Sequence, residues 1–194
     1  MPDKSFSKTE QLFLLELSRK VLNFYIKEQK EVIMKPEEVL ITKLKNEQGC
    51  FVTLHKKEQL RGCIGHILPI QPLYLDVIDN TINAALHDPR FNQVEISELP
   101  FIDIEISVLS IPEKLIFNSS EELLNKLKPE KHGVILKKDV YNSTFLPQVW
   151  KDLPDKKAFL SQLSLKAGLP PLAWQESGLE VYIYEAFVFS EKDF

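Results

Sequence analysis

The heptapeptide LRGCIGH at residues 60–66 gathers residue types that the rest of the chain uses sparingly. It holds two of the six glycines, one of the two cysteines and one of the three arginines in 194 residues. A cysteine thiolate is a nucleophile, and a guanidinium beside it lowers the pKa of the thiol. The same guanidinium can instead hold a carboxylate or phosphate through its planar fork. The segment therefore predicts a site built on Cys63 and Arg61.

Strand geometry decides which of these side chains can act together. Successive side chains of an extended strand point to opposite faces, so Arg61 and Cys63 share one face and His66 lies on the other. A Cys63–His66 pair then requires a bulge at Gly65. Glycines inside a strand mark a bulge or a close backbone approach. We interpret Gly62 and Gly65 as the wall of an accessible pocket, and core packing of Cys63 is the alternative.

Two further residues extend the candidate site. Arg90 follows a helix that Pro89 stops, and it can either pair with Asp88 or point into a cleft. Glu105 interrupts the apolar run FIDIEISVL, where an exposed position and a pair with an arginine are both open. The predicted catalytic residue is Cys63, as a nucleophile or a radical-handling thiol. The predicted ligand-binding residues are Arg61, Gly62, Gly65, Arg90 and Glu105.

Several other chemistries are not expected from the sequence. Cys63 and His66 supply two metal ligands at CxxH spacing, and no second CxxC or HxxxH completes a set of four. The chain has no P-loop, dinucleotide-binding, GxSxG or HExxH pattern. It also lacks a CxxxCxxC run for an iron–sulfur cluster. We therefore expect no metal and no cofactor of its own.

The elements that must position the site are interspersed helices and strands. Periodicity and capping residues predict helices at 7–29, 73–87, 119–127 and 155–168. Alternation predicts strands at 50–55, 59–67, 101–109, 132–138, 141–147 and 178–190. The first two strands form a hairpin over Lys57 and Glu58, in a register that places Val52 opposite Cys63. Short turns imply antiparallel pairing, so we expect an α+β fold with a mainly antiparallel sheet flanked by helices.

Composition bounds the class of protein. The length suits one large domain or two small ones, and 44% hydrophobic with 27% charged residues is typical of a globular protein. The net charge of −4 argues against a non-specific nucleic-acid surface. Two cysteines cannot form a disulfide scaffold, and the start MPDKSFSKTEQ lacks the apolar stretch of a secretory signal. With no long apolar run, we expect a cytoplasmic protein without a membrane span.

The ordered segments GCFVTLHK, LRGCIGH, DPRF, IDIEISVLS, HGVIL, TFLPQVW and KAGLPPLAW resemble AMMECR-type proteins, whose bacterial and archaeal members are called AmmeMemoRadiSam system protein A. The resemblance covers about residues 9–189, and LRGCIG is the hallmark of that family. It implies a single AMMECR-type domain over residues 1–194, with two interleaved subdomains and the hallmark lining a cleft.

The resemblance also implies partner proteins, because the genes of this family lie beside those of a Memo-like dioxygenase relative and a radical SAM enzyme. We expect an enzyme or enzyme component that works with these two proteins in the modification of a nucleic-acid base or small molecule. In that hypothesis Cys63 is the working thiol, Arg61 positions an anionic group, and Arg90 and Glu105 complete the cleft. The alternative is a non-catalytic binding or adaptor module whose arginines hold an acidic ligand or partner.

Overall fold

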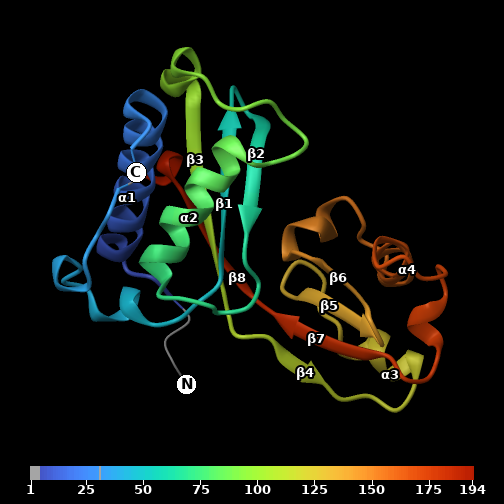
Figure 1. Cartoon of the computed structure of the whole chain (residues 1–194). Coiled ribbons are helices and arrows are strands. Elements are labelled where there is room, and N and C mark those ends of the chain that lie inside the picture. The colour runs from blue at the N-terminus through green and yellow to red at the C-terminus, as the bar shows by residue number, and fades with distance from the viewer. Residues whose placement is uncertain (1–4, 31) are drawn as a thin grey trace. The chain divides into compact units, whose positions relative to one another are not determined.

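The computed structural model describes residues 5–30 and 32–194 (Figure 1). Residues 1–4 and residue 31 lie outside the described residues. The segment MPDKSFSKTEQ, which was inspected for a secretory signal, begins in the first of these. The chain divides into two compact units, one made of Met1–Ile111 with Phe187–Phe194 and the other of Pro112–Ala186. The first unit is thus built from two stretches of chain, and the second lies between them in the sequence. Each unit has its own sheet and core.

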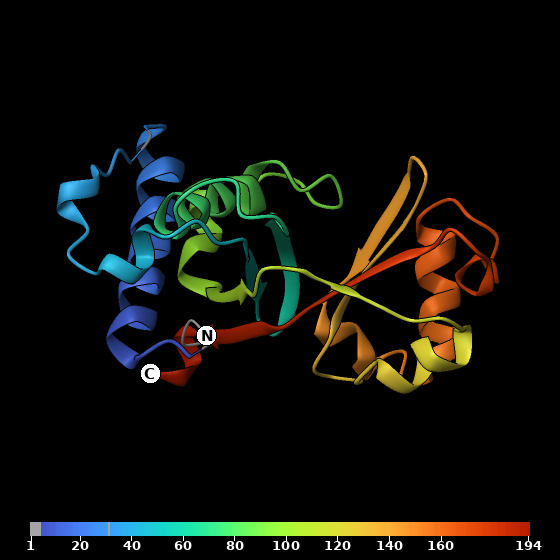
Figure 2. The ribbon, with the colours of Figure 1, turned by 90° about the horizontal axis from the view of Figure 1, so that it is seen from below.

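The first unit contains a four-stranded sheet in the order β2-β1-β3-β8. Its strands are β1 (Cys50–Lys56), β2 (Gln59–Gly65), β3 (Ile102–Leu109) and β8 (Ala186–Ser190). Two helices, α1 (Lys8–Glu28) and α2 (Leu73–Leu86), pack on one face of this sheet (Figures 1 and 2). Short 3-10 helices lie at Pro36–Glu38, Thr42–Lys45, Ile96–Phe101 and Glu191–Asp193.

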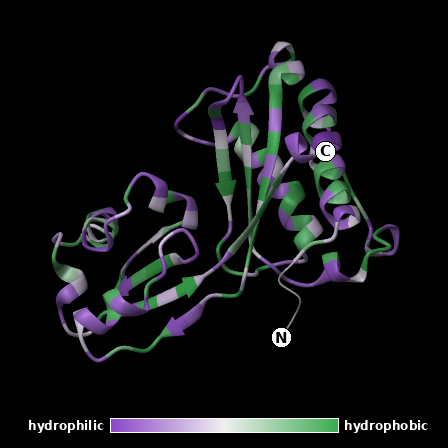
Figure 3. Cartoon of the chain, turned by 180° about the vertical axis from the view of Figure 1, so that it is seen from behind, coloured by the Kyte–Doolittle hydropathy of each residue, from purple (hydrophilic) through white to green (hydrophobic). Residues whose placement is uncertain are grey.

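Alternation along the strands decides which face is buried (Figure 3). Val52 and Leu54 of β1 and Ile104 and Ile106 of β3 are fully buried and form one core with residues of both helices. The side chains between them occupy the other face, as period-two geometry requires. Helix α1 begins with a capping box, in which Ser7 and Glu10 bond to each other's backbone N–H groups. The strand that carries Cys63 pairs with β1, whose alternate residues belong to this core.

The second unit contains the sheet β4-β7-β5-β6. Its elements are β4 (Glu113–Leu115), α3 (Ser120–Lys126), β5 (Gly133–Lys138), β6 (Tyr141–Phe145), α4 (Lys156–Lys166) and β7 (Glu180–Tyr184). Short 3-10 helices lie at Pro147–Lys151 and Ala173–Gln175. In its core the rings of Trp150 and Phe159 are stacked with centroids 3.6 Å apart. Trp150 also donates its indole N–H to the carbonyl of His132 at 2.7 Å.

The predicted α+β class is confirmed, with two antiparallel sheets flanked by helices. Two details of the prediction are wrong. The expected single strand at 178–190 is broken at Glu185, and its halves β7 and β8 belong to different sheets. The expected hairpin register holds only next to the turn, because Arg61 has no partner on β1 and the pairing shifts there. Thr53, and not Val52, is therefore the residue opposite Cys63.

Candidate functional site

Arg61 is fully engaged by the protein itself. Its Nε and Nη2 donate to the two carboxylate oxygens of Glu98 at 3.0 and 2.9 Å. Its Nη1 and Nη2 also donate to the backbone carbonyls of Asn92 and Gln93 at 2.8 and 3.1 Å. Both charged side chains are only 13% exposed. The guanidinium, with Lys56 as a second partner of Glu98, holds the pKa of that carboxyl at about 2. Arg61 thus ties segment 92–98 to the edge strand.

The backbone of Cys63 is held from outside the sheet. Because β2 is an edge strand, the outward N–H and C=O groups of Cys63 have no neighbouring strand. Asp88 accepts the Cys63 N–H at 2.8 Å, and Arg90 donates from Nη2 to the Cys63 carbonyl at 3.3 Å. Arg90 also binds both oxygens of Asp88, at 2.9 and 2.6 Å. The segment HDPRF therefore takes the place of a missing strand at this one residue.

The thiol of Cys63 lies in a row of three side chains that crosses the sheet. Thr53 of β1 is the direct partner of Cys63, and Glu105 of β3 is the direct partner of Thr53 on its other side. The hydroxyl of Thr53 donates to the sulfur at 3.2 Å. All three side chains point away from α1 and α2, since the alternate residues form the helix-facing core. The structure thus places Cys63 and Glu105 on one face, with Thr53 between them.

The surroundings keep the Cys63 thiol protonated. Burial raises its pKa above the ordinary value, and the Thr53 hydrogen bond and the Arg90 charge only partly oppose this effect. Asp88 and Glu105 raise the pKa further. The neighbouring carboxyl behaves in the opposite way, because its bonds to Arg90 lower the pKa of Asp88 to about 2. An ionised Asp88 therefore sits beside a neutral thiol.

Other parts of the protein pack closely against the two glycines of LRGCIGH. A Cβ placed on Gly62 would lie 2.1 Å from the carbonyl oxygen of Ala84, so this glycine lets helix α2 approach the strand. A Cβ on Gly65 would lie 2.3 Å from both the ring of Phe51 and the carbonyl oxygen of Cys50. The space beside each glycine is filled by protein.

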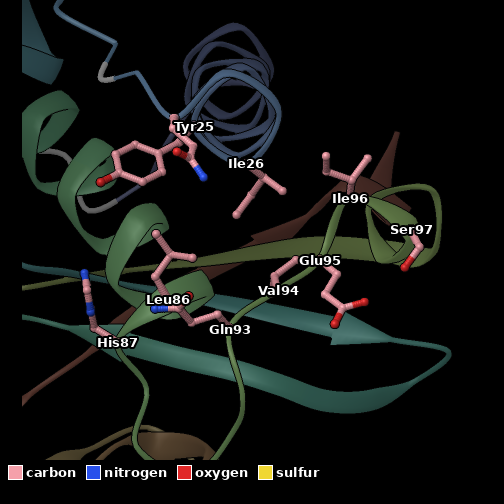
Figure 4. Close-up of a pocket in the computed structure, with 10 residues that line it drawn as sticks. Tyr25, Ile26, Leu86, His87, Gln93, Val94, Glu95, Ile96 and Ser97 are labelled. Carbon is pink, nitrogen blue, oxygen red and sulfur yellow. The ribbon is translucent and has the colours of Figure 1, made fainter.

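A groove of about 740 Å³ lies at the C-terminal ends of α1 and α2, next to segment 93–97 (Figure 4). Its lining residues are Tyr25, Ile26, Gln29, Leu86, His87, Gln93, Val94, Glu95, Ile96 and Ser97. None of these ten is a predicted site residue. Arg61 bonds to one lining residue, through the backbone carbonyl of Gln93. The lining of this groove does not include Cys63.

The structure separates the predicted site residues into two groups. Cys63, Arg90 and Glu105 lie together, whereas the guanidinium of Arg61 is directed to Glu98. Sequence analysis did not predict that Thr53 and Asp88 bond to Cys63. The Asp88–Arg90 pair, which it left open, is formed. No local signal marks Glu98, which lies 37 positions from Arg61.

His66 does not pair with Cys63. The strand pairing runs regularly through Ile64 and Gly65, so no bulge occurs at the position that such a pair requires. The imidazole instead meets Asp76 of α2, with Nδ1 and Oδ1 2.7 Å apart. Among the described residues, no group of three His, Cys, Asp or Glu side chains is arranged to hold a metal ion. In the same part of the chain, no helix is long and apolar enough to cross a membrane.

Fold and site together define an α+β protein with a free, half-buried thiol fixed on the edge strand of a sheet. The AMMECR1 family model matches residues 15–189, and the chain belongs to that family. Protein MK0488 of Methanopyrus kandleri is 39% identical over 93% of this chain and 88% of its own length. Protein MJ0810 of Methanocaldococcus jannaschii is 38% identical over 94% and 90%.

A solved structure supports the same assignment. The crystal structure of uncharacterized protein PH0010 from Pyrococcus horikoshii superposes with a TM-score of 0.84 at 36% identity. The match covers 93% of this chain and 90% of that one. The predicted membership in the AMMECR-type family is therefore confirmed.

Proposed function

We propose that the chain is a cytoplasmic enzyme component, a single AMMECR-type domain, whose working group is the thiol of Cys63. Its partners in this proposal are a radical SAM protein and a Memo-like protein, and its substrate is a nucleic-acid base or a related small molecule. One observation carries the proposal, which is the fixation of Cys63 at three points. Asp88 holds its N–H, Arg90 its C=O and Thr53 its sulfur. Such positioning is what a reactive group needs and a packing cysteine does not.

The protonated state of the thiol selects between the two roles that the sequence leaves open. A nucleophile needs the thiolate, which burial disfavours here. A hydrogen-atom donor needs the S–H bond, which burial preserves. We therefore assign Cys63 to the second role, the handling of a radical.

The step is a hydrogen-atom transfer. A substrate carbon radical, generated by the radical SAM partner, takes the hydrogen atom of Cys63. The S–H bond breaks, a C–H bond forms, and Cys63 becomes a thiyl radical. One electron from an iron–sulfur reductant and one proton from solvent restore the thiol. This chain contributes the position and the protonation state of the donor.

In this proposal Arg90 replaces Arg61 as the residue that positions an anionic group of the substrate. Its side chain is 53% exposed, and its Nη1 makes no hydrogen bond to any described residue. Glu105 closes the other end of the row, and Gly62 and Gly65 support the site only by allowing close packing. Arg61 holds segment 92–98 and contacts no ligand.

The test is complementation of a strain that lacks this gene, read out as its metabolite and RNA-modification profile. Cys63→Ala and Cys63→Ser are expected to leave the profile of the deleted strain. Cys50→Ala, a change at the buried cysteine, is the matched control and is expected to restore the parental profile. Full restoration by Cys63→Ala at normal protein levels would exclude the thiol from the chemistry.

The exposed guanidinium of Arg90 also favours a second function, a non-catalytic adaptor that holds an acidic ligand or partner. The two functions differ in the variants that they tolerate. An adaptor would work with Cys63→Ala and fail with Arg90→Gln, whereas the enzyme component fails with both. Arg90→Lys keeps the charge and removes the fork, so an adaptor that needs only a cation would survive it.

A further inference from the structure

A buried carboxylate orients the imidazole of His66 directly after β2. Asp76 is 1% exposed, and its Oδ1 lies 2.7 Å from His66 Nδ1. The same carboxylate accepts the backbone N–H of Cys50 at 2.9 Å and the side-chain amide of Gln71 at 3.2 Å. These bonds prevent Asp76 from turning away. Because an ionised carboxylate only accepts, the proton of the neutral ring belongs on Nδ1 and the lone pair on Nε2.

The Nε2 atom of His66 is available to another molecule. The side chain is 36% exposed, and no described residue forms a hydrogen bond to Nε2. A carboxylate on one ring nitrogen and a free lone pair on the other is the arrangement of an oriented base.

A second buried side chain, that of Asn80, lies next to the ring and has one polar atom without a partner. Asn80 is fully buried, and its Nδ2 lies 3.3 Å from both the carbonyl oxygen of Cys50 and His66 Nδ1. Its Oδ1 has no hydrogen-bond partner among the described residues. Buried acceptors in native proteins are normally satisfied by protein, water or ligand. The side chain that contacts the ring therefore retains one unsatisfied acceptor.

The charges at the site limit the class of ligand. Asp76 lies against the ring. Asp79 is linked to Asp76 through Gln71, whose side-chain amide donates to Asp76 at 3.2 Å and to Asp79 at 2.7 Å. Two carboxylates disfavour a phosphate or carboxylate at this place and favour a neutral or cationic group.

We propose that His66 is a proton acceptor for a neutral or cationic ligand that carries an O–H or N–H group, and that Asp76 is its positioning residue. The lone pair of Nε2 takes the proton of the ligand, and the electrons of the broken O–H or N–H bond stay on the ligand. The resulting imidazolium is stabilised by Asp76. This site is separate from the Cys63 thiol and does not depend on the function proposed for it.

The wild-type protein alone gives the first test, a ¹H–¹⁵N NMR experiment that reports the tautomer of each neutral histidine. His66 is expected to carry its proton on Nδ1. His87, which is exposed and serves as the internal reference, is expected to show the ordinary Nε2–H form. An Nε2–H tautomer at His66 overturns the proposal, whatever the behaviour of any variant.

Reactivity gives the second test. Diethyl pyrocarbonate modifies the free nitrogen of neutral imidazoles, and mass spectrometry separates the four histidines. His66 is expected to react faster than His87, and Asp76→Asn is expected to slow His66 about tenfold and leave His87 unchanged. Gln71→Ala is a milder second variant, which loosens Asp76 without removing its charge. Equal rates at His66 and His87 in the wild type would contradict an oriented base.

The third test asks whether the cell needs the base. In the complementation assay His66→Gln is expected to fail and His87→Gln to succeed. A functional His66→Gln protein would refute the role of His66, even if Cys63 proves essential. A dispensable Cys63 with an essential His66 would refute the thiol function and support the base.

Discussion

Arg61 and Glu98 face each other through two parallel hydrogen bonds, of 3.0 Å from Nε and 2.9 Å from Nη2. Arg61 is therefore the anchor of segment 92–98, which contributes to the wall of the groove at the ends of α1 and α2. Arg61, which the sequence marks as a residue able to bind an anion, binds the carboxylate of Glu98 in the same chain.

Replacement of Arg61 by Lys is expected to destabilise the protein by about 2 kcal/mol, the scale of hydrogen bonds to charged groups. Lysine is a point charge and cannot bond both Glu98 oxygens and the two backbone carbonyls at once. Urea unfolding followed by far-UV circular dichroism measures the change. Lys114→Gln, which removes an exposed ion pair with Glu180, is the control and is expected to have no measurable effect. Equal stability of Arg61→Lys and the wild type would show that one charge is enough.

Acid is expected to weaken the same contact. The pKa of Glu98 is lowered from 4.5 to about 2 in the folded protein, so its contribution to stability is fully present above pH 4.5. The contribution is lost as pH falls from 4.5 towards 2, because the unfolded chain binds the proton first. The difference in melting temperature between wild type and Glu98→Gln should therefore be largest at neutral pH and shrink in acid. A difference that does not depend on pH would show that Glu98 acts through packing.

The amide of Cys63 is expected to exchange slowly with solvent although it lies on a sheet edge. Asp88→Ala should accelerate its hydrogen exchange about tenfold or more, since a hydrogen bond to a charged acceptor is lost. Arg90→Gln leaves this N–H bonded to Asp88 and should have a smaller effect. Exchange that is already fast in the wild type would show that HDPRF does not protect the edge.

The hydroxyl of Thr53 lowers the pKa of the Cys63 thiol. Removing that donor in Thr53→Val should raise the pKa further and slow alkylation by iodoacetamide at mildly alkaline pH. Thr53→Ser keeps the hydroxyl and is expected to behave like the wild type. Cys50 is fully buried and should react only after unfolding, which makes it an internal measure of folding. Faster alkylation of Thr53→Val would show that the Thr53 hydroxyl does not lower the pKa of the Cys63 thiol.

A methyl group on Gly62 is expected to destabilise the protein by about 1–3 kcal/mol, the usual cost of forcing atoms into a packed interior. The clash is with the backbone oxygen of Ala84. Ala84→Gly should therefore not rescue Gly62→Ala, and thermal melts of the single and double variants check this. Leu60→Ala, at an exposed position of the same strand, is the control. Rescue by Ala84→Gly would mean that the side chain of Ala84 sets the limit.

Much of the fold could be predicted because it follows from local patterns. The alternation in FIDIEISVL assigned Ile104 and Ile106 to the core and Glu105 to the other face, as observed. The helix before Asp88 ends where the proline requires. Periodicity indicates which side of a helix or strand is buried. It therefore predicts the positions whose place in the fold is decided by burial.

The shift in the hairpin register could not be predicted. Lys57 and Glu58 adopt positive φ angles of 50° and 67° without the glycine or asparagine that normally announces such a turn. Arg61 then drops out of the pairing with β1, and its side chain bonds to Glu98. Glu98 lies far away in the sequence, so no local pattern reveals this contact.

Sequence analysis named Cys63 as a candidate residue, but it did not reveal most of the side chains that hold Cys63. Cys63 was identified by rarity of residue type, and its actual partners come from other elements. Asp88 is 25 positions from Cys63, and Asp76 is 10 positions from His66. Side chains that meet across a helix and a sheet carry no shared signal in a single sequence.

The order of elements along the chain has a consequence for folding during synthesis. Strand β3 is made before residues 112–185, yet its outer neighbour β8 is made only after them. Until then the nascent first unit has three strands and an unpaired edge on β3, a surface on which other chains can aggregate. The second unit can fold meanwhile as one continuous stretch. A chain truncated just before β8 would therefore contain the strands of the second unit, but its first unit would keep an unpaired edge on β3.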